Sequence, residues 1–354
     1  MDEKMTARAQ TTAHAEPTDL YLGDIATYRP ENRVPAAYFA QFALDDDLAD
    51  NVMFRAPAHR HHAGADESNA DMMVAAAQRL IARHGAGHLD DVDIVVTHSQ
   101  LPEVPVRGCA GELAHRLGLR PTTVLDVHNG GCAAFLHMIE VGGALLRARG
   151  GGTALLALAQ NSAGQIFTQE QVRGKAQAAI PGDGAAVATL MLGDGPNPVL
   201  TTVCRSHGEY SADMTAVSEP ARKYWESGPG QIHVGFTESK IAKVLTRGNR
   251  LVPEVAIEAA TAIDIRPRDL DWLITNQPNR IFLRNWREAL ELPAERHPDT
   301  FEECGNLFAV GIPMTLDALI DSGRLRDPDV IMMAAFAHAG DFAAAAAVRW
   351  SGRS

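Results

Sequence analysis

The stretch DVHNGGCAAF, at residues 126–135, joins a run of strand-forming residues to a long apolar helix pattern. This arrangement predicts that Cys132 lies on a sharp strand-to-helix turn, at the amino end of a helix. Backbone N–H groups and the helix dipole at such a position favour a thiolate and lower the thiol pKa. A thiol of this kind is suited to be a covalent nucleophile. The alternative is a structural cysteine, because free cysteines are often buried.

Composition excludes several classes of protein. The chain has 354 residues, 46% of them hydrophobic, which is enough for a sizeable core. Its formal net charge of −12 argues against a nucleic-acid partner, because phosphate binding needs a basic surface. The four cysteines lack CxxC spacing and fit neither a zinc site nor a disulfide framework, so we expect no metal. We find no apolar run of about 18 residues and no signal-peptide pattern, and therefore expect a cytoplasmic protein.

Strand-like and helix-like segments alternate along the chain, which predicts an α/β protein with parallel-rich sheets covered by helices. Helix patterns cover residues 69–84, 108–117, 135–148, 252–263, 280–292 and 306–322. Strand patterns cover residues 92–97, 122–127, 153–159, 185–192, 272–274, 330–335 and 343–350. Residues 206–237 are expected to be an irregular connection, and residues 1–17 a disordered tail.

Four further motifs follow the cysteine segment in a fixed order. They are IPGDGAA at 180–186, DWLITNQPN at 271–279, CGN at 304–306 and AFAHAG at 335–340. Together these segments resemble the β-ketoacyl-carrier-protein synthase III family of the thiolase superfamily, over about residues 20–350. The resemblance implies a thiolase-like five-layered αβαβα fold with two similar halves. Residues 18–196 would carry the cysteine nucleophile, and residues 197–354 the asparagines of the site.

The Gly182-Asp183-Gly184 segment on its own lacks the lysine and the longer glycine spacing of a phosphate loop. We interpret it as a tight turn before a core strand. Cys304, beside the Gly-Asn pair of the third motif, is interpreted as a core residue.

The resemblance assigns roles to three side chains. Cys132 matches the nucleophile that takes an acyl group from a thioester, and Asn306 matches the asparagine that hydrogen-bonds the carbonyl of the second substrate. The histidine of the family falls on Asn276, where this chain departs from the pattern. Asparagine donates an N–H but cannot act as a base at neutral pH. Losing a preorganised donor to a developing oxyanion typically costs about 10²–10³ in rate, so condensation with a malonyl-type substrate is the step most affected.

Two other histidines could supply a base near the thiol. His128 lies four positions before Cys132, and His338 lies on the segment where the family has a glycine-rich loop. Either of them could instead only hydrogen-bond the backbone. The oxyanion hole implied by the resemblance comprises the N–H of Cys132 and an N–H at Ala339 or Gly340.

The resemblance also implies partners. Arg55 fits the position of an arginine that holds coenzyme A, although no tryptophan accompanies it. Arg280 and Arg284, on the helix pattern from residue 280, fit a surface that meets an acidic carrier protein and its phosphopantetheine; the alternative is a solvated charged face. An acyl-phosphopantetheine or acyl-coenzyme A thioester would then be a substrate, with no bound cofactor. A homodimer formed through the first sheet is expected, with residues 153–159 as the candidate edge strand.

These observations favour a synthase-III-like acyltransferase of specialised metabolism, in which Cys132 takes an acyl group and passes it to a second substrate. The first alternative is a carbon–carbon bond-forming ketoacyl synthase in which Asn276 replaces the usual histidine. The second is a catalytically silent partner subunit of a synthase heterodimer. Retention of Cys132 argues against the silent subunit, which has no need of the thiol.

Overall fold

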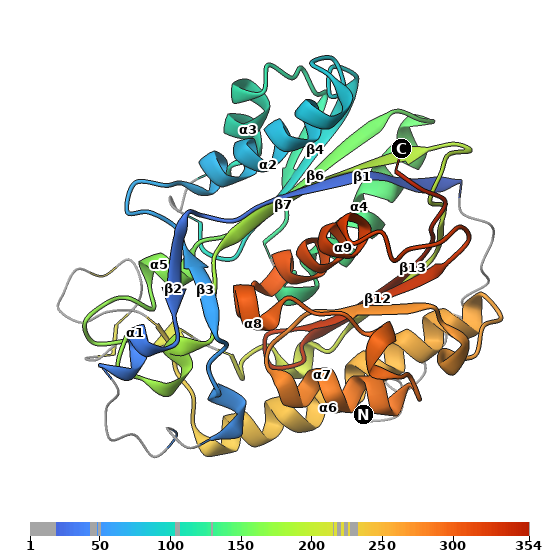
Figure 1. Ribbon diagram of the computed structural model, residues 1–354. Helices are drawn as coiled ribbons and strands as arrows, with labels where there is room; N and C mark the ends of the chain where they lie inside the picture. Colours follow the sequence, from blue (N-terminus) through green and yellow to red (C-terminus); the bar gives the residue numbers. More distant parts are fainter. Residues whose placement is uncertain are drawn as a thin grey trace, which may run out of the picture.

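The computed structural model describes residues 19–42, 48, 51–102, 107–128, 130–214, 216–217, 221–222, 226 and 233–353. The predicted tail at residues 1–17 and Asn129 of the cysteine turn lie outside the described residues. Within them, two sheets and three sets of helices are stacked in five layers, as Figure 1 shows. The predicted αβαβα architecture is therefore confirmed.

The two main sheets come from different parts of the chain. The first has the strand order β1 (Leu20–Tyr28), β7 (Gly184–Leu192), β6 (Thr153–Gln160), β4 (Val92–Ser99) and β5 (Thr123–Asp126). The second has the order β11 (Trp272–Thr275), β12 (Val330–Ala337), β13 (Phe342–Arg349) and β8 (Val199–Ser206). Two short ribbons pair β2 (Asn32–Pro35) with β3 (His59–His62), and β9 (Ala216–Val217) with β10 (His233–Val234). A division of the chain near residue 197 agrees with this distribution and stays a proposal.

The longer helices cover both sheets. α2 (Asn69–His84) and α3 (Ala110–Arg116) pack on the outer face of the first sheet. α4 (Ala134–Arg149) and α9 (Gly311–Asp321) fill the layer between the sheets. α6 (Glu238–Ala262) lies on the outer face of the second sheet, and α7 (Arg280–Ala289) packs beside it. Short helical segments are α1 (Ala37–Ala40), α5 (Ser162–Gln165), α8 (Phe301–Cys304), η1 (Val52–Phe54), η2 (Gly131–Ala133), η3 (Ala176–Ala179), η4 (Gly208–Tyr210), η5 (Pro267–Asp269), η6 (Ala294–Arg296) and η7 (Phe308–Val310).

Three sequence predictions about the sheets and α6 need correction. The sheets are mixed rather than parallel-rich: β6–β4, β4–β5 and β11–β12 are parallel, and the other neighbouring pairs are antiparallel. Alternating strands and helices do not reveal that β12 and β13 are joined by a short turn. The strand at 153–159 is not an edge, because β6 lies between β7 and β4. α6 begins at Glu238, 14 residues before the predicted start at residue 252, and continues through Pro253.

Alanine brings the layers close together. In β13, Ala344 and Ala346 face the layer between the sheets, while Ala343, Ala345 and Ala347 face α6. Small side chains on both faces of a strand let helices approach it closely from either side, which suits an interior packed at crystal-like density. The residues from Gly131 to Arg149, which include α4, are long and apolar enough to span a membrane by length and composition, contrary to the sequence prediction. In the structure this helix packs between the two sheets, and buried core helices share these properties.

Asp183 shows why the GDG turn is structural. The carboxylate is fully buried and accepts hydrogen bonds from the N–H groups of Ala63, Ala163 and Gly164, at 2.7–2.8 Å. Burial raises the pKa of Asp183 to about 7, and the three N–H donors act in the opposite direction. The side chain thus ties the loop after β3 and the start of α5 to the strand β7, as expected of a turn that leads into the core.

Replacing Asp183 with asparagine is expected to destabilise the fold by about 2 kcal/mol, because an amide NH₂ would face at least one buried N–H donor. Urea unfolding at pH 8 measures the change. Asp194→Asn, at an exposed position just after the other end of β7, is the matched control and should unfold like the parent protein. Equal midpoints for the two variants would contradict a structural role for the buried carboxylate.

Candidate active site

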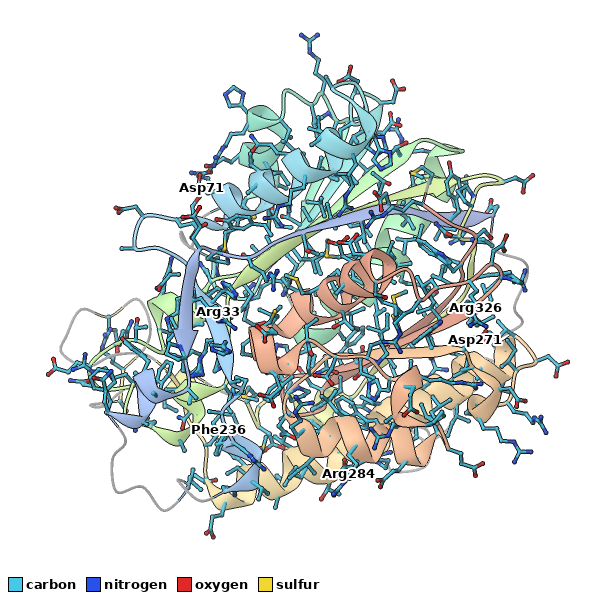
Figure 2. All side chains as sticks on the ribbon, viewed as in Figure 1. Arg33, Asp71, Phe236, Asp271, Arg284 and Arg326 are labelled. Carbon is cyan, nitrogen blue, oxygen red and sulfur yellow. The ribbon has the colours of Figure 1, made fainter. Side chains whose placement is uncertain are left out.

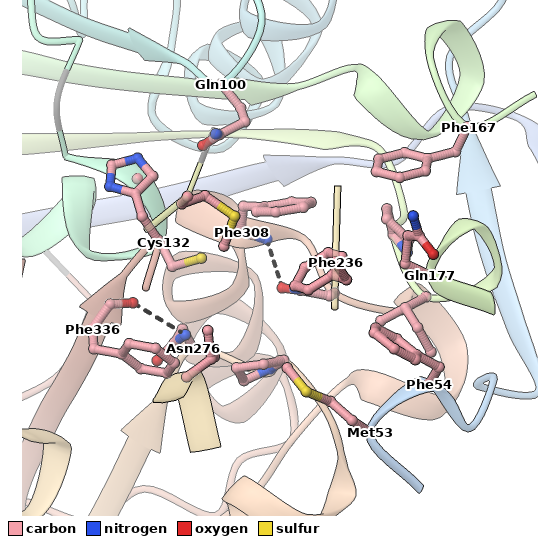
Figure 3. Close-up of a pocket in the computed structure, with 18 residues that line it drawn as sticks. Met53, Phe54, Gln100, Cys132, Phe167, Gln177, Phe236, Asn276, Phe308 and Phe336 are labelled. Carbon is pink, nitrogen blue, oxygen red and sulfur yellow. Dashed lines mark hydrogen bonds between the residues drawn. The ribbon is translucent and has the colours of Figure 1, made fainter. Parts of the chain in front are cut away.

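A cavity of about 130 Å³ lies between the two halves of the chain, with Cys132 on its wall. Cys132 and Asn276 lie at one end of it, and Phe167 and Gln177 lie at the other, as Figure 3 shows. Asn306 and His338 also line it, so the structure brings together four of the predicted site residues. The remaining wall is mostly apolar and aromatic: Met53, Phe54, Phe167, Ile180, Met214, Phe236, Val244, Phe308 and Phe336.

Cys132 lies where the sequence places it, at the amino end of a helix. η2 holds the cysteine and leads directly into α4, which starts at Ala134. Gly131, just before it, has a φ of +48°, which favours glycine. A Cβ on Gly131 would lie 2.9 Å from both Ala337 Cβ and His338 Nε2. The absence of a side chain at residue 131 therefore lets the imidazole of His338 lie against the cysteine turn.

His338 is oriented by a buried carboxylate. Its Nδ1 lies 2.9 Å from Asp341 Oδ1 and 3.2 Å from Oδ2, and Asp341 is only 9% exposed. An ionised carboxylate only accepts hydrogen bonds, so Nδ1 carries the proton and Nε2, on the side of Gly131, presents its lone pair. A nucleophile, a base near it and a carboxylate that orients the base are the parts of a catalytic triad. The structure shows the His338–Asp341 pair and places His338 with Cys132 on the wall of one cavity.

The backbone at His338 is strained. Its φ is +48°, in the left-handed region, and it is the second residue of a turn in which the Gly340 N–H donates to Ala337 O at 2.9 Å. A residue with a side chain in this region costs about 1–3 kcal/mol, and glycine would relieve the strain. The strained backbone therefore lies at the residue that carries the candidate base.

Burial raises the pKa of the Cys132 thiol to about 12, although a hydrogen bond from the Asn276 side chain and the cysteine's own backbone N–H favour the thiolate. The sequence predicts a lowered pKa from the helix terminus, and that prediction is wrong for the resting protein. The reason is that the thiol lies on the wall of a mostly apolar cavity, an environment that the sequence does not show. A protonated thiol needs a base to become a nucleophile, and His338, whose Nε2 lies against Gly131, lines the same cavity.

The two asparagines differ in what they offer a substrate. Asn276 is fully buried, hydrogen-bonds the thiol and donates from Nδ2 to Phe336 O at 3.5 Å, drawn as a dashed line in Figure 3. Asn306 Oδ1 accepts the N–H of Phe308 at 3.0 Å, which leaves its Nδ2 to donate into the cavity. Asn276 therefore supports the thiol, and Asn306 is the amide placed to meet a substrate carbonyl.

The structure distinguishes the two N–H groups predicted as alternatives for the oxyanion hole, those of Ala339 and Gly340. Gly340 uses its N–H in the turn to Ala337 O, so it is not free for a substrate. The N–H of Ala339 makes no hydrogen bond to any residue that the structure describes, and Ala339 is buried beside the site. Cys132 and Ala339 are thus the pair of N–H groups that fit the predicted hole.

His128 lies outside the cavity and is exposed, whereas His98 was not predicted and lies nearby. His98 is 1% exposed, and its Nδ1 lies 2.8 Å from Val127 O, which ties the end of β4 to the cysteine turn. Burial lowers the pKa of His98 to about 4, so it stays neutral at physiological pH. Asp341 was also missed; its spacing of three residues from His338 is the signal that could have found it.

The predicted arginines occupy different environments. Arg55 is exposed directly after η1, whose Met53 and Phe54 line the cavity. Arg284, labelled in Figure 2, is exposed on the outward side of α7, where its Nε lies 3.9 Å from the equally exposed Glu288. Arg280 is already paired, with Nη2 2.7 Å from Glu302 and Nη1 3.2 Å from Asp299. The first two arginines are therefore better placed than Arg280 to meet a phosphate.

Known proteins resemble this chain in both sequence and fold. A family model described as 3-oxoacyl-[acyl-carrier-protein (ACP)] synthase III C terminal matches residues 260–350. A β-ketoacyl-[acyl-carrier-protein] synthase III of Sinorhizobium medicae is 26% identical over 282 residues, which cover 78% of this chain and 83% of the relative. The crystal structure of the FabH synthase III of Pseudomonas aeruginosa has a TM-score of 0.80 at 22% identity, covering 95% and 99% of the two chains. Cerulenin-bound OleA of Xanthomonas campestris has a TM-score of 0.78 at 17% identity, covering 96% and 100%.

The fold is that of the thiolase superfamily, with the cavity between its two halves. In sequence the chain is similar to proteins named as β-ketoacyl-[acyl-carrier-protein] synthases III, and this similarity supports an enzyme of the acyl-transferring or condensing kind.

The raised thiol pKa predicts how Cys132 reacts with iodoacetamide. Because only the thiolate is alkylated, the rate at Cys132 should rise about tenfold per pH unit from pH 7 to 10 without levelling off. Peptide mass spectrometry follows this residue separately from the other three cysteines. A free cysteine peptide, which levels off above its pKa of about 8.5, is the reference. Levelling off at Cys132 below pH 8 would show a resting thiolate and contradict the expectation.

Gly131→Ala is expected to abolish acylation of Cys132 by thioesters, because the added methyl group displaces the imidazole of His338. Gly118→Ala is the control: it has a similar φ of +71° but open space around the new Cβ. Both variants should lose about 1–2 kcal/mol from left-handed strain, seen in thermal unfolding. Only the variant at residue 131 should lose acylation, measured as intact mass. Full acylation of Gly131→Ala would show that the close approach of His338 to Gly131 is not needed for acylation of Cys132.

Proposed function

We propose that this protein is an acyltransferase in which Cys132 takes an acyl group from a thioester and passes it to an oxygen, nitrogen or sulfur nucleophile. The observation that carries the proposal is the base. The family histidine is missing at Asn276, and His338, oriented by Asp341, faces the cysteine turn instead. A general base beside an acyl cysteine serves acyl transfer directly, because an acceptor O–H, N–H or S–H must lose a proton as it attacks.

Acylation begins with His338. Nε2 accepts the thiol proton of Cys132 as the sulfur attacks the thioester carbonyl, and Asp341 stabilises the imidazolium that forms. The N–H groups of Cys132 and Ala339 hold the oxyanion of the tetrahedral intermediate. When the intermediate collapses, the carbon–sulfur bond to the donor breaks, and the leaving thiolate takes the proton from His338.

Transfer to the acceptor reverses the same steps. The acceptor gives its proton to His338 Nε2 as it attacks the acyl carbonyl on Cys132. The new bond forms as the bond from carbon to Sγ breaks, and the cysteine sulfur recovers a proton from the imidazolium. Asn276, hydrogen-bonded to the sulfur, stabilises it as the leaving group.

The polar groups favour transfer over decarboxylative condensation. Condensation needs donors on the enolate oxygen of the second substrate. Asn306 can supply one from Nδ2, whereas Asn276 is fully buried and engaged with the thiol and Phe336 O. With one such donor in place of two, the enolate is less well stabilised than the tetrahedral intermediate of acyl transfer.

The cavity walls and the surface suggest the donor. Apolar and aromatic side chains around the cavity suit an apolar acyl group. Arg55 and Arg284, both exposed, are placed to meet the phosphate of an acyl carrier protein or coenzyme A thioester. The names of the relatives specify an acyl carrier protein, which supports a carrier-bound donor. A role in specialised metabolism fits an acceptor other than a malonyl thioester.

A homodimer and a cytoplasmic location complete the proposal. β5 is the outer strand of the first sheet and bears Val124, which is 49% exposed. An unpaired strand edge with an exposed hydrophobic residue is suited to pair with a second copy of the chain. This edge replaces the predicted strand at 153–159.

The test is intact-protein mass spectrometry after incubation with a panel of acyl-N-acetylcysteamine and acyl-carrier-protein thioesters. A mass gain that is lost in Cys132→Ala identifies the acyl carrier. His338→Ala should slow transfer to small alcohols, amines and thiols by about 10²-fold or more, as expected for loss of a general base. His128→Ala, at the exposed histidine outside the cavity, is the matched control and should transfer at the parental rate.

The outcomes of this experiment distinguish the three functional hypotheses. Release of carbon dioxide from malonyl-carrier protein with a carbon–carbon product would favour the condensing synthase. No acyl mass on Cys132 with any donor, together with tight binding to a related synthase, would favour the silent subunit. Equal rates of acyl transfer by His338→Ala and the parent protein would contradict the role of His338 as the general base.

A further inference from the structure

The turn at residues 337–341 carries both the base and the free N–H, and an arginine from α6 fixes it from outside the cavity. Arg247 Nη1 donates to Ala339 O at 3.2 Å. A Cβ on Gly340 would lie 3.0 Å from Arg247 Cβ, so the arginine stem rests directly on the turn. The peptide between residues 339 and 340 is thus held on both sides, by Arg247 at its carbonyl and by Ala337 O at its N–H.

Arg247 is itself held by residues of the connection that follows β8. Its Nη1 lies 2.6 Å from Asp213 Oδ2, and its guanidinium lies over the ring of Tyr210 at 3.7 Å. The side chain of Arg247 is 15% exposed, so this ion pair is partly shielded from water. A charge-assisted hydrogen bond and a cation–π contact together fix the guanidinium more firmly than either could alone.

The same connection contacts the turn and the cavity directly. The N–H of His207 donates to Asp341 O at 2.7 Å, next to the catalytic carboxylate. Met214, one residue after Asp213, lines the cavity. Residues 207–214 therefore link the substrate wall to the base through Arg247 and Asp341.

We propose that Arg247 is a positioning residue for catalysis. It keeps the Ala339 N–H and the His338 imidazole aimed at Cys132, and it does so through Asp213 and Tyr210. This inference rests on the proposed function, because it assigns the turn a role in acylating Cys132. Arg247 does not line the cavity, so it acts on the rate of the chemical step and not on substrate binding. Asp213 pairs with Lys243 at 3.1 Å as well as with Arg247, and among the described residues it is the Arg247 guanidinium that connects this carboxylate to the turn.

The test measures single-turnover acylation of Cys132 by mass, over a range of acyl-N-acetylcysteamine concentrations. Arg247→Met should lower the maximal rate about tenfold or more, a loss smaller than removal of an oxyanion donor, with the half-saturating concentration unchanged. Arg247→Lys should retain part of the rate, because an ammonium keeps the charge but loses the planar fork. Arg250→Met is the matched control: Arg250 lies about one turn further along α6, is 48% exposed and, within the described part of the chain, pairs with Glu254 alone.

A double-mutant cycle separates positioning from a general loss of structure. Asp213→Asn should lower the maximal rate in the parent protein and have no further effect in Arg247→Met, because both changes break one connection. If Arg247→Met does not fold, as judged by thermal unfolding, Asp213→Asn alone decides: an unchanged rate overturns the inference. The inference is also overturned if a folded Arg247→Met acylates Cys132 at the parental rate. It is overturned as well if the effects of Arg247→Met and Asp213→Asn on the maximal rate are fully additive. Failure of the parent protein to acylate Cys132 would instead count against the proposed function.

Discussion

The site depends on the contact between two backbone turns from opposite halves of the chain. Gly131 precedes the nucleophile, and the turn at Ala337 and His338 carries the base. No side chain fits between them, since even a Cβ would approach Ala337 and the imidazole to 2.9 Å. The close packing of the five layers maintains this contact. It fixes the position of α4, in the middle layer, relative to β12, in the second sheet.

A second close contact between the two halves, at the backbone of Asn306, also depends on glycine. Gly182 donates its N–H to Asn306 O at 3.1 Å, and Asn306 donates to Ile180 O at 2.9 Å. A Cβ on Gly182 would lie 1.9 Å from Cys304 O, and one on Gly305 would lie 2.5 Å from Ile180 O. The GDG and CGN motifs, more than a hundred residues apart, are therefore one structural unit that fixes the backbone of the asparagine.

The sequence predicted most of the architecture, and its failures have physical causes. α2 was predicted at its observed bounds, because its apolar period is regular and Ser68 and Asp71 form a capping box at its start. α6 was predicted too short, because Pro253 imitates a helix start although the packing of the helix on β12 and β13 tolerates it. Strand direction was not predictable from periodicity, which is the same in parallel and antiparallel pairs. Cys132, Asn276, Asn306 and His338 were named from motifs and from the family resemblance, and all four line one cavity; their catalytic roles stay predictions. The raised thiol pKa and Arg247 were not predicted, because both depend on groups brought together by folding.

The left-handed backbone at His338 has a consequence for the stability of the protein. A glycine there would release the strain of the turn and raise the free energy of unfolding, while removing the imidazole. Stability and chemistry thus favour different residues at one position. The turn therefore gives up some stability of the fold in order to hold an imidazole at the wall of the cavity.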